Sequence, residues 1–144
     1  MFIEQPPEFF RKLYPGAVWR MDPNEKAVYL TFDDGPIPEV TPWVLDLLDK
    51  HNIKATFFMV GDNIRKHPDE FRMVVERGHR IGNHTFNHIR GFEYTAKNYL
   101  GNTEQAKIFM EMGGGHQLQC GEGSLPSLGS ALPTAICSPT SISR

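Results

Sequence analysis

The sequence predicts an α/β fold in which parallel strands alternate with helices. Two short apolar runs, at residues 27–32 and 55–61, are rich in strand-forming residues, and continuous runs of this length are typical of buried strands. Segments with apolar residues at helical spacing follow them, which is the pattern of parallel βα units. A complete eight-stranded βα barrel takes about 250 residues, whereas this chain has 144. We therefore expect the first part of a larger βα structure.

The first unit begins with the strand at residues 27–32, which ends at the turn-forming residues 33–36, Asp-Asp-Gly-Pro. Thr41 followed by Pro42 predicts the start of a helix, with Thr41 as the N-cap and the proline in the first helical position. Asn52 offers a stop at the other end of this helix. The apolar residues that recur at helical spacing in between are Trp43, Val44, Leu47 and Leu48.

The second and third units follow in the same order. After the strand at residues 55–61, Pro68 opens a helix that Gly78 ends. A third strand is expected at residues 80–83, followed by a third helix at residues 95–112. The apolar face of the second helix consists of Phe71, Val74 and Val75.

The composition changes sharply near residue 112. Residues 1–112 contain all sixteen aromatic residues, whereas seventeen of the thirty-two residues 113–144 are Gly, Ser, Pro or Thr. Such a segment offers little apolar surface to offset the entropy lost on ordering it. We therefore expect a partial domain at residues 1–112 and a low-complexity, irregular tail at 113–144, either disordered or translated out of frame.

Charge and hydropathy exclude several classes of partner. The formal net charge is −2, which gives no reason to expect binding to nucleic acid or to a membrane surface. No apolar run approaches the roughly 18 residues of a transmembrane helix. The first residues lack the basic and apolar regions of a signal peptide, so a cytoplasmic location is expected. The sequence favours no oligomeric state.

A pair of adjacent carboxylates, Asp33 and Asp34, follows the first predicted strand. Because successive side chains diverge, one of them can bind a metal ion while its neighbour faces a substrate water molecule. Gly35 permits backbone conformations closed to other residues, and Pro36 fixes the next φ angle. The alternative is a solvated Asp-Gly turn, which is common after strands.

Two histidines, His84 and His88, follow the third predicted strand. Histidines four residues apart on one helical turn lie on the same face and can bind one metal ion together. The alternative is that they are incidental polar residues of a loop. The pair favours a metal site because Asp33 and Asp34 follow another strand of the same sheet, and functional residues of βα barrels gather where strands end.

These segments resemble the NodB-homology domain of polysaccharide deacetylases, carbohydrate esterase family four. The resemblance covers roughly residues 26–112 and rests on the motifs Thr-Phe-Asp-Asp-Gly-Pro at 31–36 and His-Thr-Phe-Asn-His at 84–88. It implies the N-terminal part of a distorted (β/α) barrel. It also implies that Asp33 is the general base and that Asp34, His84 and His88 hold a divalent metal ion. Zinc suits this ligand set best, with cobalt, nickel and manganese as alternatives.

The implied function is metal-dependent hydrolysis of N-acetyl groups on amino sugars of a glycan, such as chitin-type or peptidoglycan chains. The family segments that follow the third helix, including the one that supplies the general acid, are absent here. The alternative is therefore a non-catalytic remnant that retains metal or glycan binding. We expect structural or solvated roles for the other histidines of the body, which are His51, His67 and His79.

Overall fold

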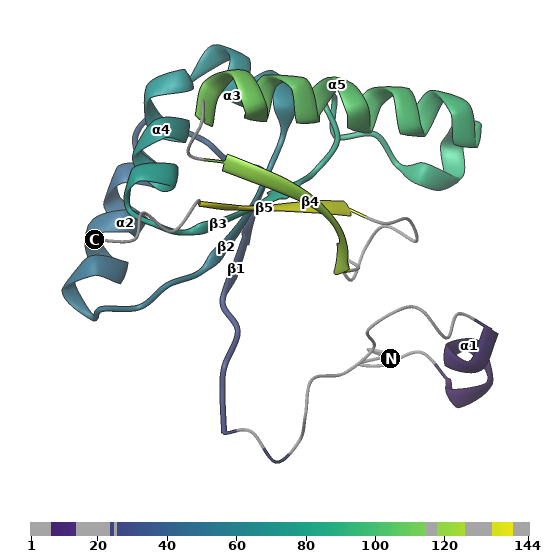
Figure 1. Cartoon of the computed structure of the whole chain (residues 1–144), viewed down its shortest axis with the longest axis horizontal. Coiled ribbons are helices and arrows are strands. Elements are labelled where there is room, and N and C mark those ends of the chain that lie inside the picture. Colours follow the sequence, from purple (N-terminus) through teal and green to yellow (C-terminus); the bar gives the residue numbers. More distant parts are fainter. Residues whose placement is uncertain (1–6, 14–23, 25, 115–117, 126–133, 140–144) are drawn as a thin grey trace.

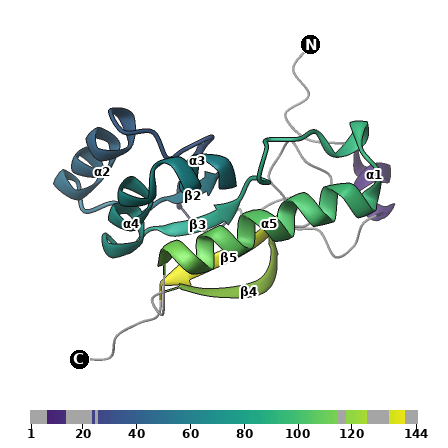
Figure 2. The same cartoon turned by 90° about the horizontal axis from the view of Figure 1, so that it is seen from above.

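The computed structural model describes residues 7–13, 24, 26–114, 118–125 and 134–139. They form one sheet, the helices packed beside it and a short helix at residues 8–13 that lies apart from the sheet (Figures 1 and 2). The strand order in the sheet is β1-β2-β3-β5-β4. The strands are β1 (Thr31–Asp33), β2 (Thr56–Met59), β3 (Arg80–Asn83), β4 (Leu118–Leu125) and β5 (Thr134–Pro139). The helices are α1 (Glu8–Leu13), α2 (Val40–Lys50), α3 (Gly61–Lys66), α4 (Pro68–Glu76), the 3-10 helix η1 (Gly91–Glu93) and α5 (Ala96–Gly114).

The three strands β1, β2 and β3 are parallel and adjacent, so their carboxyl ends meet at one edge of the sheet. Strand β2 lies between β1 and β3, and its residues Phe57, Phe58 and Met59 are buried. The helices that alternate with these strands confirm the α/β prediction. Buried side chains of β2, β3 and four helices form one core, which includes Leu45, Leu48, Phe57, Met59, Ile64, Phe71, Val74, Val75, Ile81 and Met110.

The second and third units agree closely with the prediction. Helix α4 begins at Pro68 and buries the three expected apolar residues, and the chain then turns at Gly78 with a φ of +73°. A positive φ carries little cost for glycine, which has no Cβ atom. Helix α5 begins after Thr95, whose Oγ1 accepts a hydrogen bond from the backbone N–H of Asn98 at 3.3 Å. The sequence did not predict α3.

The prediction of a buried first strand at residues 27–32 is wrong. Strand β1 contains only Thr31–Asp33, and Val28 is 86% exposed. The physical reason is that β1 pairs with β2 alone and forms one edge of the described sheet. Among the described residues no strand pairs with its other side, and Val28 and Leu30 before it are exposed.

The first helix also differs from the prediction at its start and in its buried face. Helix α2 already includes Val40, and Thr41 lies buried in its first turn, where its Oγ1 accepts a hydrogen bond from the N–H of Ile37 at 2.9 Å. Thr41 is therefore not the N-cap. The buried residues of α2 are Thr41, Leu45 and Leu48, and Val44 packs against the core partly buried. Trp43, which the prediction placed on the same face, is 64% exposed.

The expectation of an irregular tail is wrong for two segments. Strands β4 and β5 pair in an antiparallel hairpin, and β5 pairs with β3 through Ile81 with Cys137 and Gly82 with Ile136. The edge of β3 presents unpaired backbone N–H and C=O groups, and any extended segment can pair with them through its own backbone. Apolar side-chain content, on which the prediction rested, does not govern this pairing. The division of the chain at residue 112 stays a prediction, and α5 runs past it to Gly114.

Within the described ranges, none of the helices combines the length and apolarity that crossing a membrane requires.

His79 is a fully buried histidine between α4 and β3. Its Nδ1 accepts a hydrogen bond from the N–H of Ala55 at 3.2 Å, and its ring meets Phe57 edge-on. Its Nε2 is buried without a hydrogen-bond partner among the described residues. Burial lowers the pKa of His79 below its ordinary value of 6.5, and the charge of Lys54 acts in the same direction. The neutral ring is therefore part of the folded structure.

We expect acid to destabilise the fold through His79. Because the unfolded chain binds this proton more readily, the stabilising contribution is complete above about pH 6.5 and is lost as the pH falls below that value. His79→Leu should lower the free energy of unfolding at pH 7.5 by about 1–3 kcal/mol, because the N–H of Ala55 loses its acceptor. The difference from the parent protein should narrow at pH 5, as measured by urea unfolding.

His51→Leu serves as the control, because His51 is an exposed histidine at the end of α2. This variant should keep the pH dependence of the parent protein. If His79→Leu shows the same loss of stability between pH 7.5 and pH 5 as the parent, His79 is not the group responsible.

Candidate metal centre

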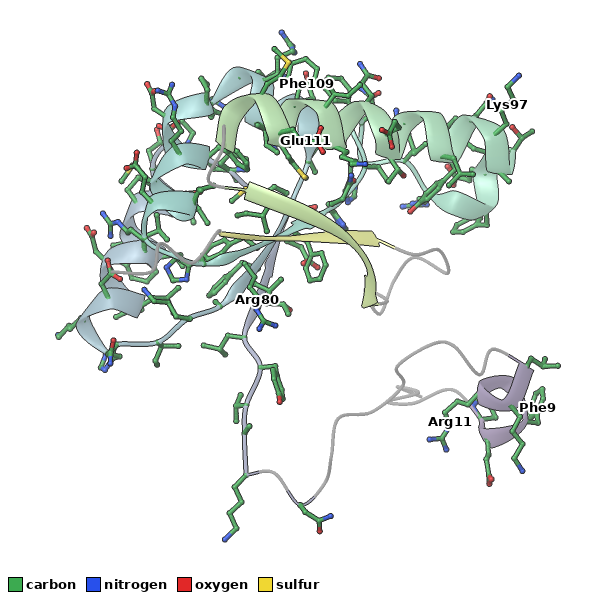
Figure 3. The ribbon with its side chains drawn as sticks, viewed as in Figure 1. Phe9, Arg11, Arg80, Lys97, Phe109 and Glu111 are labelled. Carbon is green, nitrogen blue, oxygen red and sulfur yellow. The ribbon has the colours of Figure 1, made fainter. Side chains whose placement is uncertain are left out.

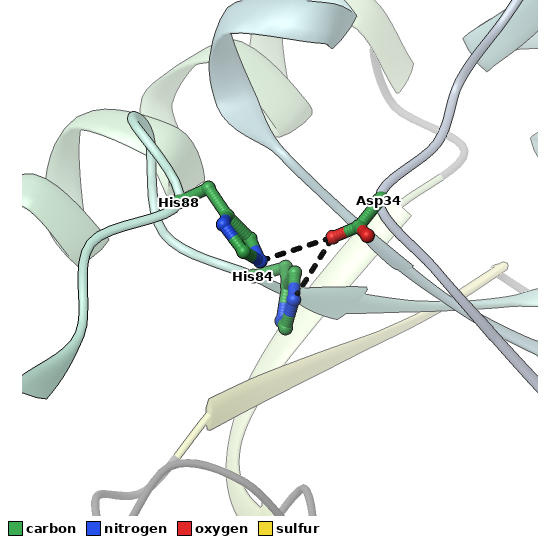
Figure 4. A group of neighbouring side chains, drawn as sticks. All are labelled: Asp34, His84 and His88. Carbon is green, nitrogen blue, oxygen red and sulfur yellow. Dashed lines mark ion pairs between the residues drawn. The ribbon is translucent and has the colours of Figure 1, made fainter.

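Asp34, His84 and His88 come together at the carboxyl ends of the parallel strands (Figure 4). Oδ1 of Asp34 lies 3.3 Å from Nε2 of His84 and 3.1 Å from Nε2 of His88. Asp34 directly follows β1 and His84 directly follows β3, two strands that β2 separates and that are therefore roughly 10 Å apart. The turn after β1 and the loop after β3 bring the side chains across the end of β2.

Asp34 is held by its backbone rather than by packing of its side chain, which is 62% exposed. Its φ of +70° lies in the left-handed region, which is strained for a residue other than glycine. Nδ2 of Asn63 on α3 donates a hydrogen bond to the backbone carbonyl of Asp34 at 2.7 Å. The carbonyl of Gly35 accepts another from the N–H of Val60 at 3.0 Å. These contacts fix the turn to the end of β2 and to α3.

The histidine pair lies in a loop, so the prediction of one helical turn is wrong. Thr85 and His88 have φ angles of +63° and +54°, and residues 84–90 contain no helix. The two left-handed residues bend the loop so that both imidazoles present Nε2 to the same carboxylate oxygen. The ring centroids are 4.9 Å apart. The two imidazoles therefore converge as predicted, but through a loop with two left-handed residues and not through a helical turn.

The first turn of α3 supports this loop. The N–H of Gly61 donates to the carbonyl of Thr85 at 2.9 Å, and the N–H of Asp62 donates to the carbonyl of Phe86 at 3.0 Å. These are free N–H groups of a helix start, which need acceptors outside the helix. The approach requires glycine at position 61, because a Cβ atom there would lie 2.5 Å from the ring of Phe86 and 2.9 Å from Ala106.

The donor set fits a divalent metal ion such as zinc. Two ligand atoms about 2.1 Å from a tetrahedral zinc ion lie about 3.4 Å apart, close to the two distances from Asp34 to the histidines. Two imidazoles and one carboxylate leave a coordination position open, which distinguishes catalytic zinc sites from structural ones. The three ligand atoms lie within 4.8 Å of one another, so one ion could contact all of them.

Asp33 is the last residue of β1, is exposed, and lies outside the cluster of the three ligand residues. Its role as general base stays a prediction. The sequence analysis missed the residues of α3 that hold the two motif segments in place, Gly61 and Asn63. One signal was present, since Gly61, Asp62 and Asn63 come shortly after β2, separated from it by Val60, at the edge where the motif residues of β1 and β3 lie.

Comparison with known families agrees with this centre. The family model described as polysaccharide deacetylase matches residues 20–119. The chain belongs to the polysaccharide deacetylase family. The match includes both motifs and extends from the segment before β1 into β4. It therefore covers all three parallel strands and the helices between them, which are the elements that position Asp34, His84 and His88.

Individual family members provide closer comparisons. The peptidoglycan-N-acetylglucosamine deacetylase of Bacillus cereus is 49% identical over 73 residues, which is 51% of this chain and 34% of that protein. The crystal structure of the Bc1960 peptidoglycan N-acetylglucosamine deacetylase superposes with a TM-score of 0.67 and 35% identity, covering 76% of this chain and 50% of that one. The chain thus spans half or less of the length of these relatives.

A third relative supports divalent metal binding in the family. The family 4 acetyl xylan esterase from Clostridium thermocellum, solved with a cobalt ion, superposes with a TM-score of 0.57 and 34% identity. The alignment covers 60% of this chain and 43% of that one. Together with the donor set of Asp34, His84 and His88, this supports a site for a divalent metal ion.

The centre predicts stoichiometric binding of one Zn²⁺ per chain, measured by isothermal titration calorimetry. Asp34→Ala, His84→Ala and His88→Ala should each weaken the affinity by more than about 100-fold, because loss of groups that merely orient metal ligands already costs 10–100-fold. His51→Ala, at the far end of α2, should bind as the parent protein does. Unchanged affinity in either variant of the motif histidines would show that the ion binds elsewhere.

Proposed function

We propose that this chain carries the metal-binding part of a zinc-dependent deacetylase that removes N-acetyl groups from amino sugars of a glycan. The observation that supports the proposal best is the convergence of Asp34, His84 and His88 in a chain of this family. The open side of the centre is accessible, because Asp34 and His88 are both more than half exposed. An extended glycan could therefore approach the ligands from solvent.

Residues of the two motifs have separate roles in the proposed hydrolysis. Asp34, His84 and His88 would hold the ion, which would lower the pKa of a water molecule and polarise a carbonyl group. Asp33, one residue from a ligand and exposed, accepts the proton of the water molecule as its oxygen attacks the carbonyl carbon. The C–N bond then breaks, acetate leaves, and the amine of the sugar takes up a proton.

The names of the relatives support a substrate class for this chain. Two of them are named for N-acetylglucosamine in peptidoglycan, and the third is an acetyl xylan esterase. We favour the amide of an N-acetylated amino sugar because the relative with 49% identity acts on that group. Chitin-type oligomers and peptidoglycan are the two glycans to compare.

A second candidate is a non-catalytic chain that binds a metal ion or a glycan without turnover. One observation favours it: among the described residues, the group that converges consists of Asp34, His84 and His88 and includes no general acid for the leaving amine. Metal binding without acetate release would support this candidate.

The two candidates differ in acetate release. The protein loaded with zinc should release acetate from N-acetylglucosamine oligomers or from peptidoglycan, as measured by an enzymatic acetate assay. Asp33→Asn should lower the rate by about 10²–10⁴-fold, the usual contribution of a general base, and should leave the zinc affinity unchanged.

Asp69→Asn is a matched control, because Asp69 is an exposed carboxylate on α4 that pairs with Arg72. It should retain the full rate. A folded parent protein that binds one zinc ion and releases no acetate from either glycan would rule out the enzymatic candidate for this chain.

A further inference from the structure

Asn102 of α5 makes three hydrogen bonds to the loop that carries His88. Its Oδ1 accepts from the backbone N–H of Phe86 at 2.7 Å and from that of Asn87 at 3.0 Å. Its Nδ2 donates to Oδ1 of Asn87 at 2.8 Å. A single amide therefore binds two consecutive backbone N–H groups and the side chain of the residue immediately before His88.

The loop is held between two helices. On one side the N–H of Asp62 in α3 donates to the carbonyl of Phe86, and on the other Asn102 in α5 accepts from the N–H of the same residue. The ring of Phe86 is buried and lies 5.2 Å from the ring of Phe109 of α5, which Figure 3 labels. Position 86 is thus fixed through its N–H, its carbonyl and its side chain.

Both motif histidines follow an asparagine that is tied to the same turn of α5. Asn83 precedes His84, and its Nδ2 donates to the backbone carbonyl of Thr103 at 2.8 Å. Asn87 precedes His88 and is bound by Asn102. Residues 102–103 of α5 therefore contact both Asn-His pairs. The same turn of the helix thus fixes the backbone that precedes each of the two imidazoles.

His88 depends on this support more than His84 does. His84 directly follows β3, its N–H donates to the carbonyl of Met59, and its side chain is only 20% exposed. His88 is 58% exposed and has a left-handed φ of +54°, a conformation that is strained for a residue other than glycine. Few contacts of its own hold it, so the backbone before it must be fixed.

We propose that Asn102 is a positioning residue for the metal centre, acting through residues 86 and 87 to fix His88 against Asp34. This inference rests on the proposed function, since it assigns a role toward the same ion. Asn102 contacts neither the ion nor the substrate. Its effect on the metal should resemble that of other groups that orient a ligand, whose loss costs 10–100-fold in affinity.

The test uses Co²⁺, which reports affinity by titration and coordination geometry by its visible absorption. Asn102→Ala should bind Co²⁺ about 10–100-fold more weakly than the parent protein and show an altered absorption spectrum. Asn102→Asp keeps oxygen acceptors for the two N–H groups and should restore the affinity to within a few-fold. Asn98→Ala removes an exposed asparagine one turn earlier on α5 and should match the parent in both readouts.

A double-mutant cycle separates positioning from a general loss of stability. If Asn102 acts through His88, Asn102→Ala should weaken Co²⁺ binding much less in a His88→Ala background than in the parent. If Asn102→Ala does not fold, Asn102→Gln replaces it, because the longer side chain keeps the amide but displaces it. Circular dichroism and thermal melting identify the folded variants.

The outcomes are distinct. A folded parent protein that binds no Co²⁺ would overturn the proposed metal centre itself. A parent that binds Co²⁺, together with a folded Asn102→Ala or Asn102→Gln of unchanged affinity and spectrum, would overturn the role of Asn102 and leave the proposed function standing.

Discussion

The hydrogen bonds at the start of α3 are the contacts on which the rest of the centre depends. Gly61 and Asp62 donate to the carbonyls of the histidine loop, and Asn63 donates to the carbonyl of Asp34. A single helical turn therefore joins two motifs that lie about fifty residues apart in the sequence. The absence of a side chain at Gly61 makes this possible, because any Cβ atom would meet both Phe86 and Ala106.

This arrangement explains how exposed ligands can be held in strained conformations. Among the described residues, those other than glycine with positive φ are Asp34, Asn52, Thr85 and His88. Three of these four belong to the two motifs, where the surrounding hydrogen bonds must offset the conformational cost. Strain at a functional site persists only when the neighbouring structure determines the geometry, and here α3 and α5 supply that structure on either side of the loop. The metal-binding geometry is thus a property of the scaffold as much as of the ligands.

The two edges of the described sheet differ. Strand β1 has no described neighbour on its outer side, and apolar residues beside it, such as Val28, are exposed. At the other edge, backbone pairing with β5 and β4 extends the sheet. The parallel strands that carry the motifs are nevertheless adjacent and in register, so the metal ligands converge within the part of the fold that this chain contains.

The sequence by itself determined the alternation of the three parallel strands with α2, α4 and α5, the family, and which three residues converge. Those features depend on local signals, such as the buried run of β2, the Pro68 and Gly78 boundaries of α4, and two motifs that each follow a strand. Tertiary structure alone decided the rest. Thr41, predicted as an N-cap, is a buried residue inside α2. The two histidines, predicted on one helical turn, lie in a loop in which Thr85 and His88 are left-handed. Asn63 and Asn102 hold the two motif segments through hydrogen bonds to partners that are distant in the sequence. Local propensity carries no information about such partners, which is why Asn63 and Asn102 could not be predicted. The motifs, in contrast, indicated Asp34, His84 and His88, which the structure brings together.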